Sequence, residues 1–187
     1  MFTNNKFTML LNFPEQIIDD FIIPAFTINE GEIIIIEILG GAKFRDLTLK
    51  LNSIFTNQNS SFKYVEHIQT DSLLSFIFPL TVEKYLKNSG SNIFYRNKIY
   101  ELNWMKPKIK VNTLAGSPRR ILSLYKTLTF TKNIIIDLVG VDPIGGVEIY
   151  QILKSNKNKN GATILFDSCN EFENDCSKFI RTKYIGE

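Results

Sequence analysis

EIIIIEILGGAKFRDLTLKL occupies residues 32–51 and decides the fold of this chain. Its four consecutive isoleucines are typical of a buried strand, and two glycines separate them from a segment with helical periodicity. A strand, a glycine-containing turn and a helix form the usual layout of a loop that binds phosphate groups. The lysine and the Ser or Thr that such a loop needs are missing from their usual places. The stretch therefore predicts the architecture of a nucleotide site without its usual chemistry.

The segments that flank this stretch on its N-terminal side alternate between apolar and polar residues, as half-buried strands do. Strands are expected at residues 6–13, 21–28 and 33–39, with Pro14 and Glu15 in the first turn. The connections between these three strands are short, which favours a small antiparallel sheet.

The rest of the chain alternates between helical and strand-like segments. Helices are expected from residue 45, near 81–88, at 118–129 and at 145–154, and strands at 62–68, 133–139 and 162–167. The inward helix faces are expected to hold Leu47, Leu51, Ile54 and Phe55, then Ile121, Leu122, Tyr125 and Leu128, then Ile149, Ile152 and Leu153. NIIIDLV at 133–139 is typical of a parallel sheet covered on both faces. The pattern predicts one α/β domain over residues 1–187, with an inserted lobe at about 70–112.

The composition is that of a globular protein, with 44% hydrophobic residues, 22% charged residues and a net charge of +3. The basic residues are interpreted as scattered, and PRR (118–120) and MKPKIK (105–110) as surface patches, so no nucleic-acid partner is expected. Cys169, Cys176 and the single histidine, His67, lack the spacing of a zinc site, and no metal is expected. The N-terminus does not resemble a signal peptide, and no apolar run reaches the ~20 residues that span a bilayer.

Five segments, taken in order, resemble the ATPase (nucleotide-binding) domain of ABC transporters. FTINEGEIIIIEI is similar to the entry strands of that family, and KYVEHIQTDSLLSFIFPLTVEKYL to its glutamine loop and the segment that follows. LAGSPRRILSLYKTL falls on the signature segment, NIIIDLVGVDP on the Walker B strand and D-loop, and GATILFDSCNE on the strand before the switch histidine. The resemblance covers almost the whole chain. It implies a P-loop NTPase-like, three-layer α/β core with a parallel sheet, a small N-terminal antiparallel β-subdomain and a short helical lobe.

The resemblance also implies where the phosphate loop lies. Counted without gaps, its positions are Gly41, Ala42, Lys43, Phe44, Arg45 and Asp46. In a working loop a lysine neutralises the phosphates and a hydroxyl holds Mg²⁺. Here Phe44 stands at the lysine position, and Arg45 and Asp46 stand at the hydroxyl positions. Either Lys43 or Arg45 replaces the missing cation, or the loop no longer grips phosphate.

The other positions implied by the resemblance differ from the family pattern too. Asp137 keeps the Walker B aspartate, but Leu138 stands where a glutamate would activate water. Cys169 stands at the switch histidine, and a thiol is a poor hydrogen-bond donor. The signature positions are Leu114, Ala115, Gly116 and Ser117. Ala115 lacks the hydroxyl that would reach a partner's γ-phosphate, whereas Ser117 could still offer one.

Two further positions carry open alternatives. Phe13 stands where the family places an aromatic that stacks on adenine, but an aromatic in a strand is also typical of a core. Gln69 is the glutamine of the glutamine loop, and His67 competes for that role on spacing.

These replacements predict a pseudo-ATPase, which keeps the fold, binds ATP and Mg²⁺ weakly or not at all, and has no catalytic residue. The resemblance implies docking onto a transmembrane permease-type subunit at the cytoplasmic face of a membrane. Apolar residues along 69–105 would receive an amphipathic helix of that subunit: Leu73, Leu74, Phe76, Phe78, Tyr85, Phe94, Tyr95, Tyr100 and Trp104. A second copy of the chain, or another ABC ATPase, is a further possible partner. Two alternative functions remain. In one, the chain is half of a heterodimer and lends its signature segment to a competent ABC ATPase. In the other, it senses nucleotide through an unorthodox loop.

Overall fold

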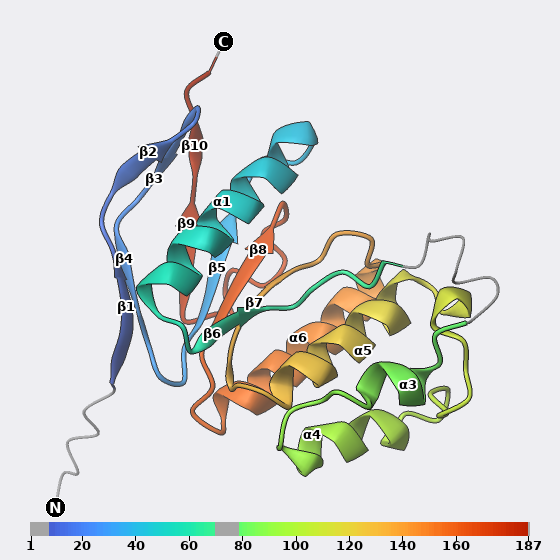
Figure 1. Cartoon of the computed structure of the whole chain (residues 1–187). Helices are drawn as coiled ribbons and strands as arrows, with labels where there is room; N and C mark the ends of the chain where they lie inside the picture. The colour runs from blue at the N-terminus through green and yellow to red at the C-terminus, as the bar shows by residue number, and fades with distance from the viewer. Residues whose placement is uncertain (1–7, 70–78, 187) are drawn as a thin grey trace, which may run out of the picture.

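A computed structural model describes residues 8–69 and 79–186 of the 187-residue chain. At its centre lies a five-stranded parallel sheet (Figure 1). The strand order is β6 (Phe62–Tyr64), β7 (Asn133–Asp137), β8 (Thr163–Asp167), β5 (Ile33–Glu37) and β9 (Lys178–Arg181). Every residue of β7 and β8 is buried, as their apolar runs predict. The expected parallel sheet is therefore confirmed.

Helices and strands cover both faces of this sheet, so the core has three layers (Figure 1). Ile34 and Ile36 of β5 point into one apolar core, which they share with α1 (Ala42–Gln58) and the N-terminal strands. Ile33 and Ile35 point into a second core, with α5 (Gly116–Leu128) and α6 (Pro143–Lys157). Because successive strand side chains alternate between the two faces, one isoleucine run supplies both cores.

The N-terminal strands pair antiparallel beside α1. The pairs are β1 (Met9–Phe13) with β4 (Phe26–Asn29), and β3 (Phe21–Ile23) with both β2 (Gln16–Ile18) and β10 (Lys183–Tyr184). Two expectations were wrong. The strand expected at 21–28 is broken between β3 and β4, where Pro24 has no N–H to donate. Residues 33–39 were assigned to the antiparallel sheet, but a run of isoleucines needs cover on both faces, and β5 lies inside the parallel sheet.

The three long helices bury the predicted faces and begin earlier than expected. Gly41 has a φ of +109°, a backbone conformation that favours glycine, and it turns the chain into α1 at residue 42. Asp142 caps α6 by accepting a hydrogen bond from the Gly145 N–H at 2.9 Å, and Pro143 follows in the first turn. The buried positions of these helices include Leu47, Leu51, Phe55, Ile121, Leu122, Tyr125, Leu128, Ile149 and Leu153.

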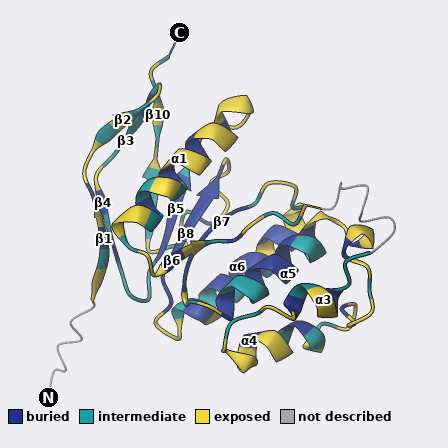
Figure 2. Cartoon of the chain, viewed as in Figure 1, coloured by how far each residue is buried: buried dark blue, intermediate teal, exposed yellow. Residues whose placement is uncertain are grey.

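The described part of the expected lobe, residues 79–112, contains only short helices. These are α3 (Val82–Leu86), α4 (Ile93–Lys98) and the 3₁₀ turns η1 (Ile99–Glu101) and η2 (Val111–Thr113). They share the apolar core of α5, and Figure 2 shows α5 largely buried while α3, α4 and α6 each have exposed residues. The expected apolar positions Leu73, Leu74, Phe76 and Phe78 lie outside the described residues. No helix in the described ranges is long and apolar enough to cross a membrane.

Candidate functional site

The loops that follow β5, β7 and β8 meet at one edge of the sheet, because the carboxyl ends of parallel strands lie together. They enclose a cavity of about 270 Å³. Its lining residues are Gly40, Gly41, Phe44, Leu138, Val139, Phe166, Asp167 and Ser168. The structure thus brings residues of the expected phosphate loop close to residues next to Asp137 and Cys169. The wall of the cavity combines apolar side chains, from Phe44, Leu138, Val139 and Phe166, with the polar side chains of Asp167 and Ser168.

Phe44 and Lys43 turn in different directions from the start of α1. Phe44 is 8% exposed and packs into the apolar core beneath the helix, so the lysine position of the loop offers no charge. The Lys43 ammonium lies 2.5 Å from the Asp20 carboxylate and 2.6 Å from the Tyr184 hydroxyl. These two hydrogen bonds raise the pKa of Lys43. Lys43 therefore binds the antiparallel strands, away from the cavity.

Arg45 is the other candidate for the missing cation. Its side chain is exposed and lines a neighbouring cavity of about 380 Å³, together with Thr48, Gln69 and Asp137. Within the described ranges Arg45 forms no ion pair. Ala42 and Asp46 are exposed on the same turns of α1.

Asp167 places a buried negative charge beside the first cavity. The residue is 9% exposed, and its Oδ1 accepts hydrogen bonds from the Ser168 and Cys169 N–H groups, at 2.7 and 3.3 Å. Burial is the largest influence and raises the pKa of Asp167. In the described part of the chain no basic side chain pairs with it. An ionised Asp167 opposes the binding of phosphate groups there.

We expect Asp167→Asn to stabilise the protein at neutral pH, because asparagine keeps the Oδ1 acceptor and removes the buried charge. The raised folded-state pKa means that the wild type loses stability as pH rises through the carboxyl range near ~4. The gain in melting temperature should therefore be absent near pH 3 and present near pH 7. Asp46→Asn, at an exposed position, is the matched control and should show no such dependence. An equal gain at both pH values would contradict the assignment.

Asp137 is the centre of a buried polar cluster at the end of β7. Tyr64 donates its hydroxyl proton to Asp137 Oδ2, and the Val139 N–H donates to Oδ1 at 2.9 Å. His67 Nε2 lies 3.0 Å from Oδ1. Arg120 Nη2 donates to Oδ2 at 3.0 Å, and both residues of this ion pair are almost fully buried. The carboxylate is thus held from four directions.

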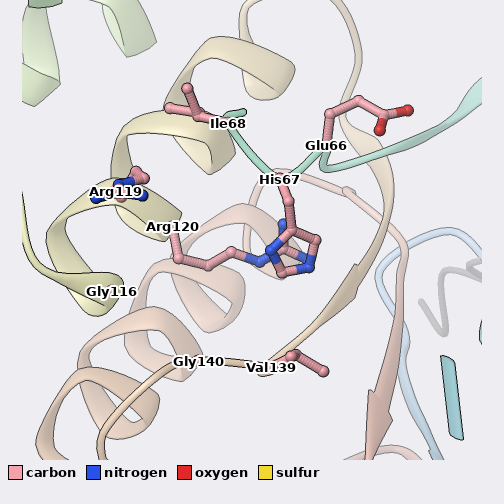
Figure 3. A pocket seen from close by; sticks show the side chains of 8 residues that line it. All are labelled: Glu66, His67, Ile68, Gly116, Arg119, Arg120, Val139 and Gly140. Carbon is pink, nitrogen blue, oxygen red and sulfur yellow. The ribbon is translucent and has the colours of Figure 1, made fainter. Parts of the chain in front are cut away.

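Arg120 connects three elements through its guanidinium. Besides the ion pair, its Nε donates to the Asp137 main-chain oxygen at 3.0 Å and its Nη1 to the Val65 oxygen at 2.6 Å. Figure 3 shows Arg120 reaching from α5 toward His67, beside a cavity of about 170 Å³. The arginine therefore ties α5 to the ends of β6 and β7.

The charge state of Asp137 follows from these contacts. Burial alone would raise the pKa of Asp137, but the hydrogen bond from His67, the charge of Arg120 and the hydrogen bond from Tyr64 together bring it below its ordinary value. Burial and the nearby Asp137 raise the pKa of Tyr64, so the phenol keeps its proton and donates it. At neutral pH Asp137 is ionised and already paired with a cation.

Residues of the expected signature segment contact the loop that follows β7. Ser117 is 5% exposed, donates its hydroxyl proton to Asp142 Oδ2, and accepts a hydrogen bond from the Asp142 N–H at 3.1 Å. A Cβ on Gly116 would lie 1.9 Å from the Gly140 oxygen, so only glycine fits where these backbones meet. Leu114 is buried and Ala115 is exposed. Within this chain the Ser117 hydroxyl therefore faces Asp142.

The remaining predicted positions separate into core and surface. Phe13 is fully buried, with its ring 5.1 Å from Phe26 and 5.4 Å from Phe55 between centroids. Of the two alternatives for Phe13, the structure supports the core role, because the ring is fully buried. Gln69 and Cys169 are exposed, and Leu138 is half-buried.

A separate groove of about 480 Å³ lies between the end of β6, α3 and α5. Its described lining includes Ile68, Leu80, Tyr85, Lys126 and Phe130. Phe130 is 51% exposed, and the Lys126 ammonium lies 4.0 Å from the centre of the Tyr85 ring. The described lining of the groove is amphipathic and includes Gln69. Of the lobe positions expected to form a docking surface, Tyr95 is buried in the core, whereas Tyr85 lines this groove.

Sequence reasoning missed the role of Arg120 and Tyr64. PRR at 118–120 was interpreted as a surface patch, and that interpretation was wrong for Arg120, which is 3% exposed. The available signal was its place on the predicted inward face of α5, next to Ile121. Among the described residues, no group of three or more His, Cys, Asp or Glu side chains is arranged to hold a metal ion.

Comparison with known proteins shows the fold. No protein-family model matches the sequence, and no curated protein is detectably similar to it. Among solved structures, a nucleotide-free ATP-binding cassette from an ABC transporter has a TM-score of 0.64 at 14% identity, over 90% of this chain and 85% of that one. CbiO1 of Clostridium perfringens, part of the ABC transporter complex CbiONQ, has a TM-score of 0.56 at 15% identity, over 95% and 86%. An inward-facing ABC transporter described as of metal-chelate type gives 0.67 at 15% identity, over 96% and 83%. The chain has an ABC ATPase-like fold, which confirms the predicted fold class.

Proposed function

We propose that this chain is a pseudo-ATPase, a docking subunit of a transporter-type membrane complex that neither holds ATP tightly nor hydrolyses it. The observation that carries the proposal is the Arg120–Asp137 ion pair. Asp137 is the one acidic group kept from the expected Mg²⁺ site, and a guanidinium inside the chain already neutralises it. A magnesium ion would have to displace a buried arginine, which is unfavourable because it leaves that charge unpaired.

The phosphate side of the site supports the same proposal. Phe44 is buried at the lysine position, Lys43 is bound to Asp20 and Tyr184, and Asp167 adds negative charge to the cavity wall. Leu138 can neither accept a proton from water nor orient it. An ammonium group that contacts the phosphates and a general base are both needed for ATP hydrolysis, and the expected positions supply neither. We therefore propose that the chain keeps the fold but does not hydrolyse ATP, and we assign no cofactor.

The groove beside Gln69 supports the docking role. It joins exposed apolar surface at Phe130 to polar groups at Tyr85 and Lys126, which suits an amphipathic helix of a transmembrane permease-type subunit. CbiO1, which shares the fold, is part of a transporter complex. Such a partner would hold this chain at the cytoplasmic face of a membrane.

One observation supports the nucleotide-sensor alternative. Arg45 lies at the edge of a 380 Å³ cavity without an ion-pair partner in the described residues, so its charge is available to an anion. The heterodimer alternative has less support, because Ser117 is bound to Asp142 and Ala115 has no hydroxyl.

Calorimetric titration with ATP and Mg²⁺ up to about millimolar concentration tests the proposal. We expect no heat of binding and no rise in melting temperature, because each missing phosphate contact removes charge stabilisation that no other described group supplies. A competent ABC ATPase measured in the same buffer is the positive control. Micromolar binding by this chain would refute the proposal. Loss of that binding in Arg45→Ala but not in Lys43→Ala would then establish the sensor.

A further inference from the structure

Charge is strongly segregated along this chain, contrary to the expectation that its basic residues are scattered. Residues 79–132 hold 11 of the 22 Lys and Arg residues but only two of the 19 Asp and Glu residues. This segment, which comprises the described lobe and α5, therefore carries a net charge of +9, and the rest of the chain carries −6. Asymmetry of this size points to an anionic partner.

Most of this charge is exposed and unpaired. Lys98 pairs with Glu101, Lys132 with Glu30 and Arg120 with Asp137. Six other basic side chains are exposed and form no ion pair in the described ranges: Lys84, Lys87, Arg96, Lys106, Lys108 and Lys110. Figure 1 shows α3 and α4 at the end of the molecule far from the antiparallel strands, so the positive charge is concentrated at one end.

Three of these lysines, Lys106, Lys108 and Lys110, lie on segment 104–110, which is hydrogen-bonded to α3. The Val82 N–H donates to the Ile109 oxygen at 3.0 Å, and the Glu83 N–H donates to the Pro107 oxygen at 3.0 Å. Met105 is buried at 2% exposure and Ile109 packs against the same core. The inward side chains hold the segment against α3, and Lys106, Lys108 and Lys110 are left in solvent beside Lys84.

The lobe also exposes apolar side chains. Trp104, two residues before Lys106 in the sequence, is 39% exposed, and Ile93 and Phe94 of α4 are 60% and 52% exposed. Trp beside lysines is typical of a segment that lies at the headgroup level of a membrane. An exposed isoleucine cannot stack on a nucleobase, so the composition favours lipid over single-stranded nucleic acid.

We infer that the basic lobe binds the headgroups of anionic lipids, with Lys106, Lys108 and Lys110 as the electrostatic contact and Trp104 at the headgroup boundary. A juxtamembrane cluster of this kind is attracted by the negative surface potential of a membrane leaflet. The inference does not depend on a permease, on nucleotide or on the proposed pseudo-ATPase, because it concerns only the lobe and a lipid surface.

Vesicle binding by the purified full-length chain tests it. Trp104 is the only tryptophan, so its emission reports on this segment alone. In low-salt buffer we expect co-sedimentation with vesicles of phosphatidylcholine containing about a third phosphatidylserine, together with a blue shift of the Trp104 emission. Vesicles of pure phosphatidylcholine should bind far less, and raising the salt should release the protein.

A matched pair of variants separates the lobe from net charge. Each basic residue near the surface adds on the order of a fivefold gain in affinity, so Lys106→Gln, Lys108→Gln, Lys110→Gln should weaken binding about 100-fold. Lys50→Gln, Lys154→Gln, Lys183→Gln removes the same charge outside the lobe and should keep most of the binding. Equal losses in the two variants, no binding to anionic vesicles, or tighter binding to single-stranded RNA than to vesicles at the same salt would each overturn the inference.

Discussion

Arg120→Met should lower the free energy of unfolding by about 3–5 kcal/mol, the cost of leaving a buried carboxylate without its cation. Arg120 and Asp137 are 3% and 1% exposed, so the carboxylate loses its cation in a buried position. The hydrogen bonds that Arg120 donates to the Val65 and Asp137 main-chain oxygens are lost as well. Equilibrium urea denaturation at neutral pH measures the change.

Two further variants make this result specific. Arg96→Met replaces an exposed arginine of α4 and should change the free energy of unfolding by no more than about 0.5 kcal/mol. The double variant Arg120→Met, Asp137→Asn removes both charges and should be more stable than Arg120→Met alone. If Arg120→Met behaved like Arg96→Met, the guanidinium would not hold Asp137, and the proposal that Asp137 is unavailable to magnesium would fail with it.

Phe13→Ala should also cost about 3–5 kcal/mol, because it opens a cavity in a well-packed core. The ring has no exposed surface and contacts Phe26 and Phe55 on two sides. These contacts tie β1 to β4 and to α1, so the loss should appear as a lower urea midpoint of the whole domain. Phe130→Ala, at an exposed position of the docking groove, is the matched control and should cost far less.

The same variant distinguishes a core role from a nucleotide role. A base platform is solvent-exposed, so its removal would leave stability nearly unchanged and reduce only the affinity for ATP. A stability change below about 1 kcal/mol would therefore contradict the core assignment of Phe13. A large loss of unfolding free energy would show that Phe13 packs between the antiparallel strands and α1 as a core residue.

The internal arginine bears on the proposed docking role. Arg120 bridges α5, β6 and β7 from inside the chain. The arrangement of these elements is therefore built into the fold, which is the property that a docking subunit needs.

Features of the site that depend on neighbouring residues could be predicted from the sequence. Contacts between residues far apart in the sequence could not. The meeting of residues 40–44, 137–139 and 167–168 at one edge followed from the order of parallel strands. The contacts of Lys43 with Asp20 and Tyr184 did not, because they join positions 23 and 141 residues apart. The same is true of Ser117 with Asp142, 25 residues away.

By itself the sequence determined the types of the long elements and the faces they bury. These are local properties, set by periodicity and by the chemistry of single residues. Only the tertiary structure decided that β5 belongs to the parallel sheet, that Phe13 is core, and that Arg120 lies against Asp137. Each of these features depends on which distant segment of the chain packs against a given side chain. Burial then determines whether the charge or ring of that side chain contacts another residue or water.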